Sequence, residues 1–417
     1  MKPKILTWVT AMISFAVVAA LATAVKSTAQ NLPEQNKPAS YTVVRLGALG
    51  GTVSGASSIN NRSWVAGFSN LAGDTTAHAT LWRNGSTIDL GTLGGPGTNS
   101  GVFWPVKNDR GLIAGIAETS DANPLGERWS CAAFFPTVTG HICLGFVWQN
   151  GVMTGLPPFL GGYNSYASGA NNLGQAVGWA ENGTHDATCV APQVLQFRAA
   201  IWGANGQIQE LSPLPGETSS AATAINDRGQ VVGISGICDR AVGRFSAAHA
   251  VLWQDGTATD IGNLGGVAWN TPAAINHLGQ VVGFSDLAGD ESGAPNFHAF
   301  LWTRSGGIQD LGTLPGDSLS LAFGINDLGQ VVGQSIGAGG SRAFLWQNGV
   351  MTDLNTLVPP GSLQLVYAND INSSGEIAGG AFDPSTGESP AFLAIPNPDG
   401  AGAASSSVPA AAMKRRR

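Results

Sequence analysis

The stretch FGINDLGQVVGQS, residues 323–335, decides the fold because closely similar copies of it recur along the whole chain. Each copy contains Ile-Asn or a close variant, then two or three residues, then Gly and an apolar pair followed by Gly. Its Asn position is occupied seven times, at intervals of 46 to 63 residues, by Asn60, Asn108, Asn171, Asn226, Asn276, Asn326 and Asn372. A repeat of about 50 residues indicates a modular array in which each copy is one structural unit.

Two further motifs alternate with the first. One is an apolar residue followed by Trp, as in Leu301-Trp302, and the other is DLGTLGG, residues 89–95, with its variants. The pair after the Trp is often Asn-Gly or Asp-Gly, which tolerates the positive φ angles of a two-residue hairpin. We therefore expect the Trp segment and the Asp-Leu-Gly segment to pair as antiparallel strands.

Four short strands in each unit predict an all-β, seven-bladed β-propeller with four-stranded antiparallel blades over residues 41–396. The repeat region begins with YTVVRLGALGG, residues 41–51, a fourth strand without its first three. It ends with AFLAIP, residues 391–396, a third strand without its fourth. We therefore expect the N-terminal strand to close the last blade. A parallel β-solenoid is the alternative, but it would not explain these complementary ends.

The three motifs resemble those of the HAF repeats, a family of bacterial extracellular proteins named for a His-Ala-Phe tripeptide. The match is carried by His298-Ala299-Phe300-Leu301-Trp302, by Asp310-Leu311-Gly312-Thr313-Leu314, and by Ile325-Asn326 with the following Gly329-Gln330-Val331-Val332-Gly333. It extends from about Tyr41 to Pro396, and the second unit departs most from the pattern. The resemblance implies export and no particular activity.

The ends of the chain predict processing and export. Lys2 and Lys4 precede a long uncharged segment with small residues after it, which is typical of a signal peptide, here residues 1–29. An uncleaved membrane anchor is the alternative. A linker over residues 30–40 and a disordered tail over residues 397–417 complete the expected organisation. The expected location is secreted, periplasmic or at the cell surface, and a net charge of −7 gives no reason to expect nucleic acid as a partner.

The cysteines support an oxidising compartment. The chain has four, and we expect two disulfides, Cys131–Cys143 within one loop and Cys189–Cys238 between neighbouring loops. Free buried thiols are the alternative. All four cysteines fall in long insertions at the same place in three successive units, residues 117–144, 180–197 and 236–248. These loops should therefore emerge on one face, as a binding surface or a cap on the channel.

Residues that recur in every unit are expected to be scaffold. Ser335 lies in a G-x-S-x-G match, but it shares its position with serines of other units and lacks the strand-to-helix context of a nucleophile. His78, His249 and His298 recur as well, and local hydrogen bonds explain them better than a metal ring. We expect no catalytic residue, no metal site and no cofactor.

Non-repeated aromatic residues are better candidates for ligand contact. We expect them to line the channel mouth with neighbouring amides and to suit stacking and hydrogen bonding to a sugar or peptide, although packing between blades would also explain any one of them. The candidates are Trp104, Trp129, Tyr163, Tyr166 and Trp269, with Asn99, Asn164 and Asn270.

The sequence thus predicts an exported, monomeric, non-enzymatic binding or interaction module for a polysaccharide or an extracellular protein. A propeller-type glycan hydrolase or lyase with acids from different blades is the alternative, and a purely structural surface protein is a third. A membrane is expected as a partner only if the signal segment stays uncleaved. The inserted-loop charges that would favour an enzyme are Glu127, Arg128, Glu181, His185, Asp239 and Arg240.

Overall fold

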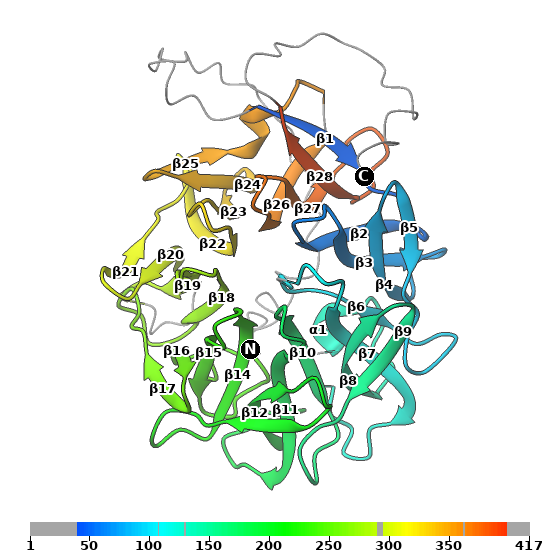
Figure 1. The fold of residues 1–417 in the computed structure, drawn as a ribbon, viewed down its shortest axis with the longest axis vertical. Helices are drawn as coiled ribbons and strands as arrows, with labels where there is room; N and C mark the ends of the chain where they lie inside the picture. The colour runs from blue at the N-terminus through cyan, green and yellow to red at the C-terminus, as the bar shows by residue number, and fades with distance from the viewer. Residues whose placement is uncertain (1–39, 107, 129–130, 290–294, 362, 398–417) are drawn as a thin grey trace, which may run out of the picture.

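The structure is a computed structural model that describes residues 40–397, apart from 107, 129–130, 290–294 and 362. The predicted signal peptide and nearly all of the predicted linker and tail lie outside the described residues. Seven four-stranded antiparallel sheets surround a central axis like the blades of a propeller (Figure 1). The predicted fold class is therefore confirmed. Within the described part of the chain, no helix is both long and apolar enough to cross a bilayer.

The strands fall into four concentric layers. The innermost strands are β2 (Gly50–Ile59), β6 (Ser100–Gly101), β10 (Ser165–Ala170), β14 (Ser219–Ile225), β18 (Thr271–Ile275), β22 (Asp317–Ile325) and β26 (Gln364–Ile371). The second strands are β3 (Val65–Leu71), β7 (Ile113–Ala122), β11 (Ala176–His185), β15 (Val231–Gly236), β19 (Val281–Asp286), β23 (Val331–Gly337) and β27 (Ile377–Phe382). The third strands are β4 (Ala77–Arg83), β8 (His141–Gln149), β12 (Leu195–Trp202), β16 (His249–Gln254), β20 (Phe297–Thr303), β24 (Gly340–Gln347) and β28 (Ala391–Pro396). The outermost strands are β5 (Ser86–Asp89), β9 (Val152–Leu156), β13 (Ile208–Leu211), β17 (Thr257–Asp260), β21 (Gly307–Asp310), β25 (Val350–Asp353) and β1 (Tyr41–Arg45).

The outer hairpin of each blade follows from its turn residues. In β4–β5, Asn84 has φ 51° and Gly85 has φ 76°, and the same positive angles recur at Asn150, Asp255 and Asn348. Two consecutive positive φ angles define a turn whose twist matches that of the flanking strands. The Trp strand therefore pairs with the Asp-Leu-Gly strand, as predicted, with Trp82 opposite Thr87 in the first blade.

The Gly that ends each Val-Val-Gly motif is required by a close backbone approach. A Cβ added at Gly333 would lie 2.0 Å from the carbonyl oxygen of Leu321 on the neighbouring inner strand. A Cβ added at the equivalent glycine of any of the other six blades would lie 1.8 to 2.4 Å from a backbone carbonyl oxygen of the inner strand. Six of the seven inner strands shift register near this contact, as β22 does between Ala322 and Gly324. The repeated Gly is therefore a steric requirement of the inner hairpin.

The last blade is built from both ends of the chain. Its sheet has the order β1-β28-β27-β26, with Tyr41 opposite Pro396 and Arg45 opposite Phe392. The junction is extended by the backbone N–H of Asn397, which donates to the carbonyl of Ser40 at 2.8 Å. The N-terminal strand thus closes the ring as the sequence predicted, and this blade has its full set of four strands.

The apolar core lies between the blades rather than within any one of them. One cluster joins Val282 and Leu301 of the fifth blade to Ile325, Phe344 and Trp346 of the sixth. Several of the repeated Trp side chains also tie a blade to its predecessor through an indole N–H, from Trp82 to Gly47 O at 2.7 Å, Trp202 to Pro157 O at 3.0 Å and Trp253 to Ser212 O at 2.7 Å. Because each blade is buried by its neighbours, the ring is stabilised as a unit.

Among the described residues, two short helices and two disulfides lie outside the regular blades. The helices are α1 (Cys131–Phe134), in the inserted loop of the second blade, and the 3-10 helix η4 (Leu354–Leu357). The intraloop disulfide joins Cys131 to Cys143, and the interloop disulfide joins Cys189 to Cys238. Both predicted pairings are those of the structure.

Candidate functional site

The Asn positions of the repeat meet around one end of the central axis. Each of these Asn side chains accepts two backbone N–H groups of its own turn through Oδ1, as Asn326 does from Leu328 and Gln330 at 3.1 and 3.0 Å. Each Nδ2 then donates to the backbone carbonyl of the corresponding Asn in the next blade, at 2.6 to 3.3 Å. The last bond, from Asn372 to Asn60, completes a cycle of seven. We call this cycle the Asn ring.

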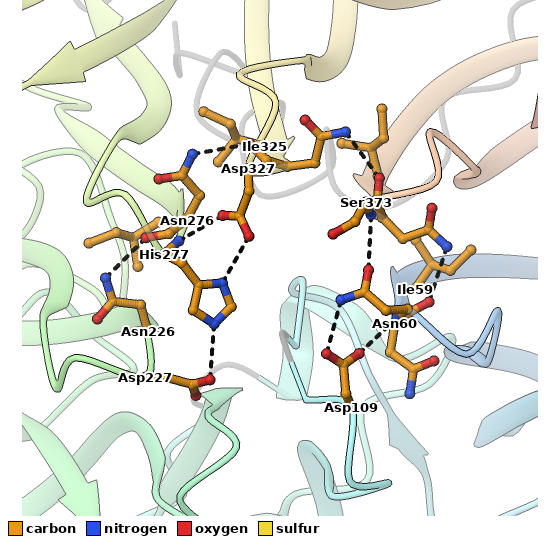
Figure 2. Close-up of a pocket in the computed structure, with 15 residues that line it drawn as sticks. Ile59, Asn60, Asp109, Asn226, Asp227, Asn276, His277, Ile325, Asp327 and Ser373 are labelled. Atoms are coloured by element: carbon orange, nitrogen blue, oxygen red, sulfur yellow. Dashed lines mark hydrogen bonds and ion pairs between the residues drawn. The ribbon is translucent and has the colours of Figure 1, made fainter.

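The residues that directly follow the Asn ring form a second polar layer, which we call the polar ring. Donors and acceptors alternate around much of it: Asn61 bonds Asp109, Asn172 bonds Asp227, and His277 bonds Asp327. Figure 2 shows the imidazole of His277 between the carboxylates of Asp227 and Asp327. The polar ring consists of Asn61, Asp109, Asn172, Asp227, His277, Asp327 and Ser373.

His277 is the titratable centre of the polar ring. Its Nε2 lies 2.9 Å from Asp227 Oδ2, and its Nδ1 lies 3.2 Å from Asp327 Oδ2. Partial burial alone would lower the pKa of His277, but the hydrogen bonds and negative charges of the two aspartates outweigh burial and raise that pKa above its ordinary value. The two carboxylates therefore link the fifth blade, through His277, to the fourth and sixth blades.

The repeated His, Asp and Ser residues make local hydrogen bonds, which is the arrangement expected of scaffold residues. His78, His249 and His298 contact Asp89, Asp260 and Asp310 at 2.8 to 3.0 Å, and Arg342 contacts Asp353 at 3.1 Å in the equivalent place. The hydroxyl of Ser335 accepts the backbone N–H of Leu314 at 3.0 Å, and the equivalent serines accept from the equivalent leucines. Ser335 thus fixes the connection between two blades.

At the other end of the channel, the inserted loops of the second, third and fourth blades are joined into one surface. The interloop disulfide connects the third and fourth blades. Glu127 of the second blade accepts the backbone N–H groups of Val194 and Leu195 of the third at 2.7 and 2.8 Å. We call this surface the loop face.

The buried acids of the loop face accept hydrogen bonds from backbone and amide N–H groups. Glu181 accepts the N–H groups of Tyr163 and Asn164, and the Gln193 amide spans Glu181 and Glu127. Burial, together with the charge of Glu127, raises the pKa of Glu181 to about 8. Glu118 lies close to Cys131 and Cys143 and accepts hydrogen bonds from Asn99, but the intraloop disulfide removes both thiolates that a metal would need.

Beneath the loop face, the channel contains a cavity of about 140 Å³ with aromatic walls. Phe103 packs on Phe134 of α1 with ring centroids 4.6 Å apart, and Phe284 packs on Phe297 at 5.6 Å. Its lining residues come from the first, second, third, fifth, sixth and seventh blades and from two inserted loops. They are Ser57, Phe68, Phe103, Trp104, Pro105, Ala133, Phe134, Trp179, Ala241, Val242, Trp269, Thr271, Phe284, Phe297, Leu321, Phe323, Gln334, Tyr367 and Asn369.

The described residues that line the cavity are uncharged. Among the described residues that line it, none is Asp, Glu, His, Lys or Arg, and its polar side chains carry hydroxyls, amides and indoles. Burial raises the pKa of the Tyr367 phenol well above its ordinary value, so this side chain stays neutral. The arrangement suits binding of a neutral, largely apolar group.

The structure brings two of the sequence-predicted aromatic residues into this cavity, Trp104 and Trp269. They come from the second and fifth blades. Trp129 lies outside the described residues.

The remaining candidates lie elsewhere. Tyr166 is fully buried and stacks on Trp179 with ring centroids 4.2 Å apart, so its ring packs in the core behind the cavity wall. Tyr163 is half-buried beside the Glu181 loop. The three amides join neighbouring blades and loops instead: Asn99 accepts from Ala77, Asn164 accepts from Cys143, and Asn270 donates to Ala248.

Sequence reasoning missed most of the cavity wall, although a signal was present. The position five residues before each ring Asn faces the channel in several blades, and it holds Phe103, Thr271, Leu321 and Tyr367 in four of them. This position varies between units while the ring Asn is constant. A repeat position whose residue type differs between units therefore predicts the cavity wall better than the presence of an unusual Trp does.

Comparisons with known proteins give likeness of shape at low identity. No family model and no curated protein matches the sequence. Among solved structures, a streptogramin B lyase is 12% identical, with 86% of this chain and 98% of that chain covered and a TM-score of 0.48. A puromycin hydrolase is 13% identical, with 82% and 53% covered and a TM-score of 0.43. A dipeptidyl peptidase 4 of Porphyromonas gingivalis is 10% identical, with 78% and 43% covered and a TM-score of 0.32. The assignment of the fold rests on the seven sheets themselves.

Proposed function

We propose that the protein is an exported, non-enzymatic binding module that takes a group of an extracellular ligand into the cavity beneath its loop face. The observation that carries this proposal is the composition of the cavity wall: aromatic rings, small hydroxyls and the amides of Gln334 and Asn369, with no charged side chain among the described lining residues. Two disulfides in the loops above it support an oxidising compartment. The resemblance to HAF repeats agrees with export.

The same wall argues against the alternative of a glycan hydrolase or lyase. A glycan hydrolase needs paired carboxylates on either side of the bond that is cleaved, and a lyase needs a general base beside the proton that it removes. On the loop face, Glu127 and Glu181 hold backbone N–H groups and do not line the cavity. Carboxylates from different blades meet in the polar ring, where Asp227 and Asp327 bond His277. We therefore favour binding over catalysis.

Of the two ligand classes expected from the sequence, the cavity favours a protein partner over a polysaccharide. A sugar ring presents several hydroxyl groups that must keep hydrogen bonds when they leave water. A partner protein can instead insert one aromatic or aliphatic side chain and leave its polar surface against the loop face, which is the usual arrangement of a buried anchor within a polar rim.

The test is a paired binding experiment with the mature chain on a glycan array and on a displayed peptide library. We expect selected peptides to share an aromatic or aliphatic anchor residue. Replacement of a lining residue, Trp269→Ala, should weaken binding at least about tenfold, whereas Tyr163→Ala, outside the cavity, should leave binding unchanged. Ligands that bind both variants equally well would contradict the proposed site, and selection of glycans alone would reverse the preference for protein.

A further inference from the structure

Two polar side chains in the wall of the cavity have hydrogen-bonding atoms without a partner among the described residues. Thr271 is 1% exposed, and its Oγ1 has no hydrogen bond. Trp104 is 8% exposed, and its Nε1 has none. Both line the same cavity. Buried polar groups in native proteins are nearly always paired, so two orphans in one uncharged cavity indicate the groups that a ligand would satisfy.

The hydrogen-bonding capacity of these two atoms restricts the class of ligand. The indole of Trp104 can only donate, whereas the hydroxyl of Thr271 can donate and accept. A ligand hydroxyl can accept from the first and donate to the second. A ligand that only accepts would leave the accepting capacity of Thr271 unused, and a ligand that only donates could not use Trp104. The absence of charged side chains among the described lining residues disfavours carboxylate, phosphate or ammonium groups, whose burial without a counter-charge is strongly unfavourable.

The size and the walls of the cavity restrict the class of ligand further. A cavity of roughly 150 Å³ lined by apolar side chains accommodates benzene in another protein, and the present cavity of about 140 Å³ has a similar volume. Its walls are mainly Phe and Trp rings, including Phe284, Phe323 and Trp269. Aromatic walls favour an aromatic occupant through offset and edge-to-face contacts.

We propose that the cavity is a phenol site: it binds a single phenolic ring whose hydroxyl is held by Trp104 Nε1 and Thr271 Oγ1. This inference rests on the proposed function and names the group that the cavity takes. A phenolic ring can come from a small phenolic compound or from a Tyr side chain of a protein partner. The chemistry of the site is the same for both.

The experiment compares para-cresol with para-xylene, which has a methyl group in place of the hydroxyl, by isothermal titration of the mature chain. We expect para-cresol to bind at least about tenfold more tightly, because one buried hydrogen bond of about 1.4 kcal/mol corresponds to that factor. Trp104→Phe and Thr271→Val should each reduce this preference while retaining affinity for para-xylene. Thermal unfolding of both variants checks that they fold, and Thr271→Val replaces an unpaired buried hydroxyl with a methyl of the same shape.

A third ligand, N-acetyltyrosinamide, separates the two sources. If it binds with the same dependence on Trp104 and Thr271, the site accepts a Tyr side chain. If only para-cresol binds, the site takes a free phenol. Equal affinity for para-cresol and para-xylene would overturn the phenol site but leave an apolar binding cavity, and so the proposed function, intact. Failure of all three ligands to bind would overturn the phenol site, while the peptide and glycan selection would still decide the proposed function.

Discussion

The Asn ring predicts an unusual pH dependence for a single substitution, Asn326→Asp. The wild-type side chain is 4% exposed, and its Nδ2 donates to the carbonyl of Asn372 at 3.0 Å and to Gln330 Oε1 at 2.7 Å. A carboxylate at this position has the same shape and keeps the accepting Oδ1. Its second oxygen, however, replaces the Nδ2 donor and faces the carbonyl oxygen of Asn372, which then has no donor from this side chain. The lost bond contributes about 1 kcal/mol and the unpaired carbonyl about 1–3 kcal/mol. With repulsion added, we expect about 3 kcal/mol less stability at pH 7.

Protonation should reverse part of this loss. When the introduced carboxyl group is neutral, it can donate to Asn372 again, so the folded state raises the pKa of this group above its unfolded value. The folded variant therefore binds the proton more tightly, and its stability relative to wild type should rise as the pH falls from about 7 towards about 5. Asn326→Ala removes the acceptor as well and should lose about 3–5 kcal/mol at every pH.

The measurement is urea unfolding followed by Trp fluorescence at about pH 7 and about pH 5, with each variant compared with wild type at the same pH. Asn263→Asp is the matched control, because this exposed residue accepts the N–H of Gly265 through Oδ1 and should tolerate a carboxylate. If the free energy of unfolding of Asn326→Asp lies within about 0.5 kcal/mol of the wild-type value at neutral pH, the bonds between blades in the Asn ring add no stability beyond the turn of each blade. That result would refute the reasoning.

Three further predictions concern the glycines, the polar ring and the disulfides. Gly333→Ala should lower the urea midpoint sharply, by the equivalent of about 3 kcal/mol or more, because the new Cβ would lie 2.0 Å from a carbonyl oxygen, whereas Gly339→Ala, with nothing within 4 Å, should change it little. The pKa of His277, measured by NMR, should lie above the ordinary value of 6.5, and Asp227→Asn should lower it. Because the pKa is raised in the folded state, the stability that His277 contributes is present at low pH and is lost as the pH rises through the folded pKa. An unchanged pKa in that variant would contradict the ion pair. Replacing the interloop disulfide with alanines should destabilise more than replacing the intraloop disulfide, about 4 against about 3 kcal/mol by loop-closure entropy, since they span 49 and 12 residues; the reverse order of melting temperatures would count against this entropic account.

The fold can be predicted because its determinants are local and repeated. The Asn-Gly turns, the Trp strands and the complementary chain ends each specify one step of the propeller, and seven copies make the pattern hard to mistake. The pairing of His298 with Asp310 is also within reach, since both recur at fixed places in the unit. The steric requirement for Gly333 cannot be predicted from the sequence. The carbonyl oxygen that excludes a larger residue lies on the inner strand β22, whose register shifts nearby.

The site is harder to predict because it is assembled from residues far apart in sequence. Trp104 and Trp269 stand out as unusual aromatic residues, and both line the cavity. Tyr166 stands out for the same reason, but its ring stacks on Trp179 in the core. Whether an inner-strand residue faces the channel or a neighbouring blade depends on the local bulge, and the sequence pattern does not show where each bulge falls. The alternation of Asp and Asn around the polar ring likewise becomes meaningful only when the blades are adjacent.

The closure of the ring by β1 and β28 has a consequence for how the protein is made. The side chains of Thr42 and Asn397, which bond each other at 2.7 Å, are 355 residues apart in the chain. During synthesis, the first strand therefore remains without its partner until almost the last described residue has been added. An unpaired apolar strand is a site for chaperones and for mispairing with other chains. Only a chain translated through β28 can close, so prematurely ended products keep an open edge and should be removed by quality-control proteases.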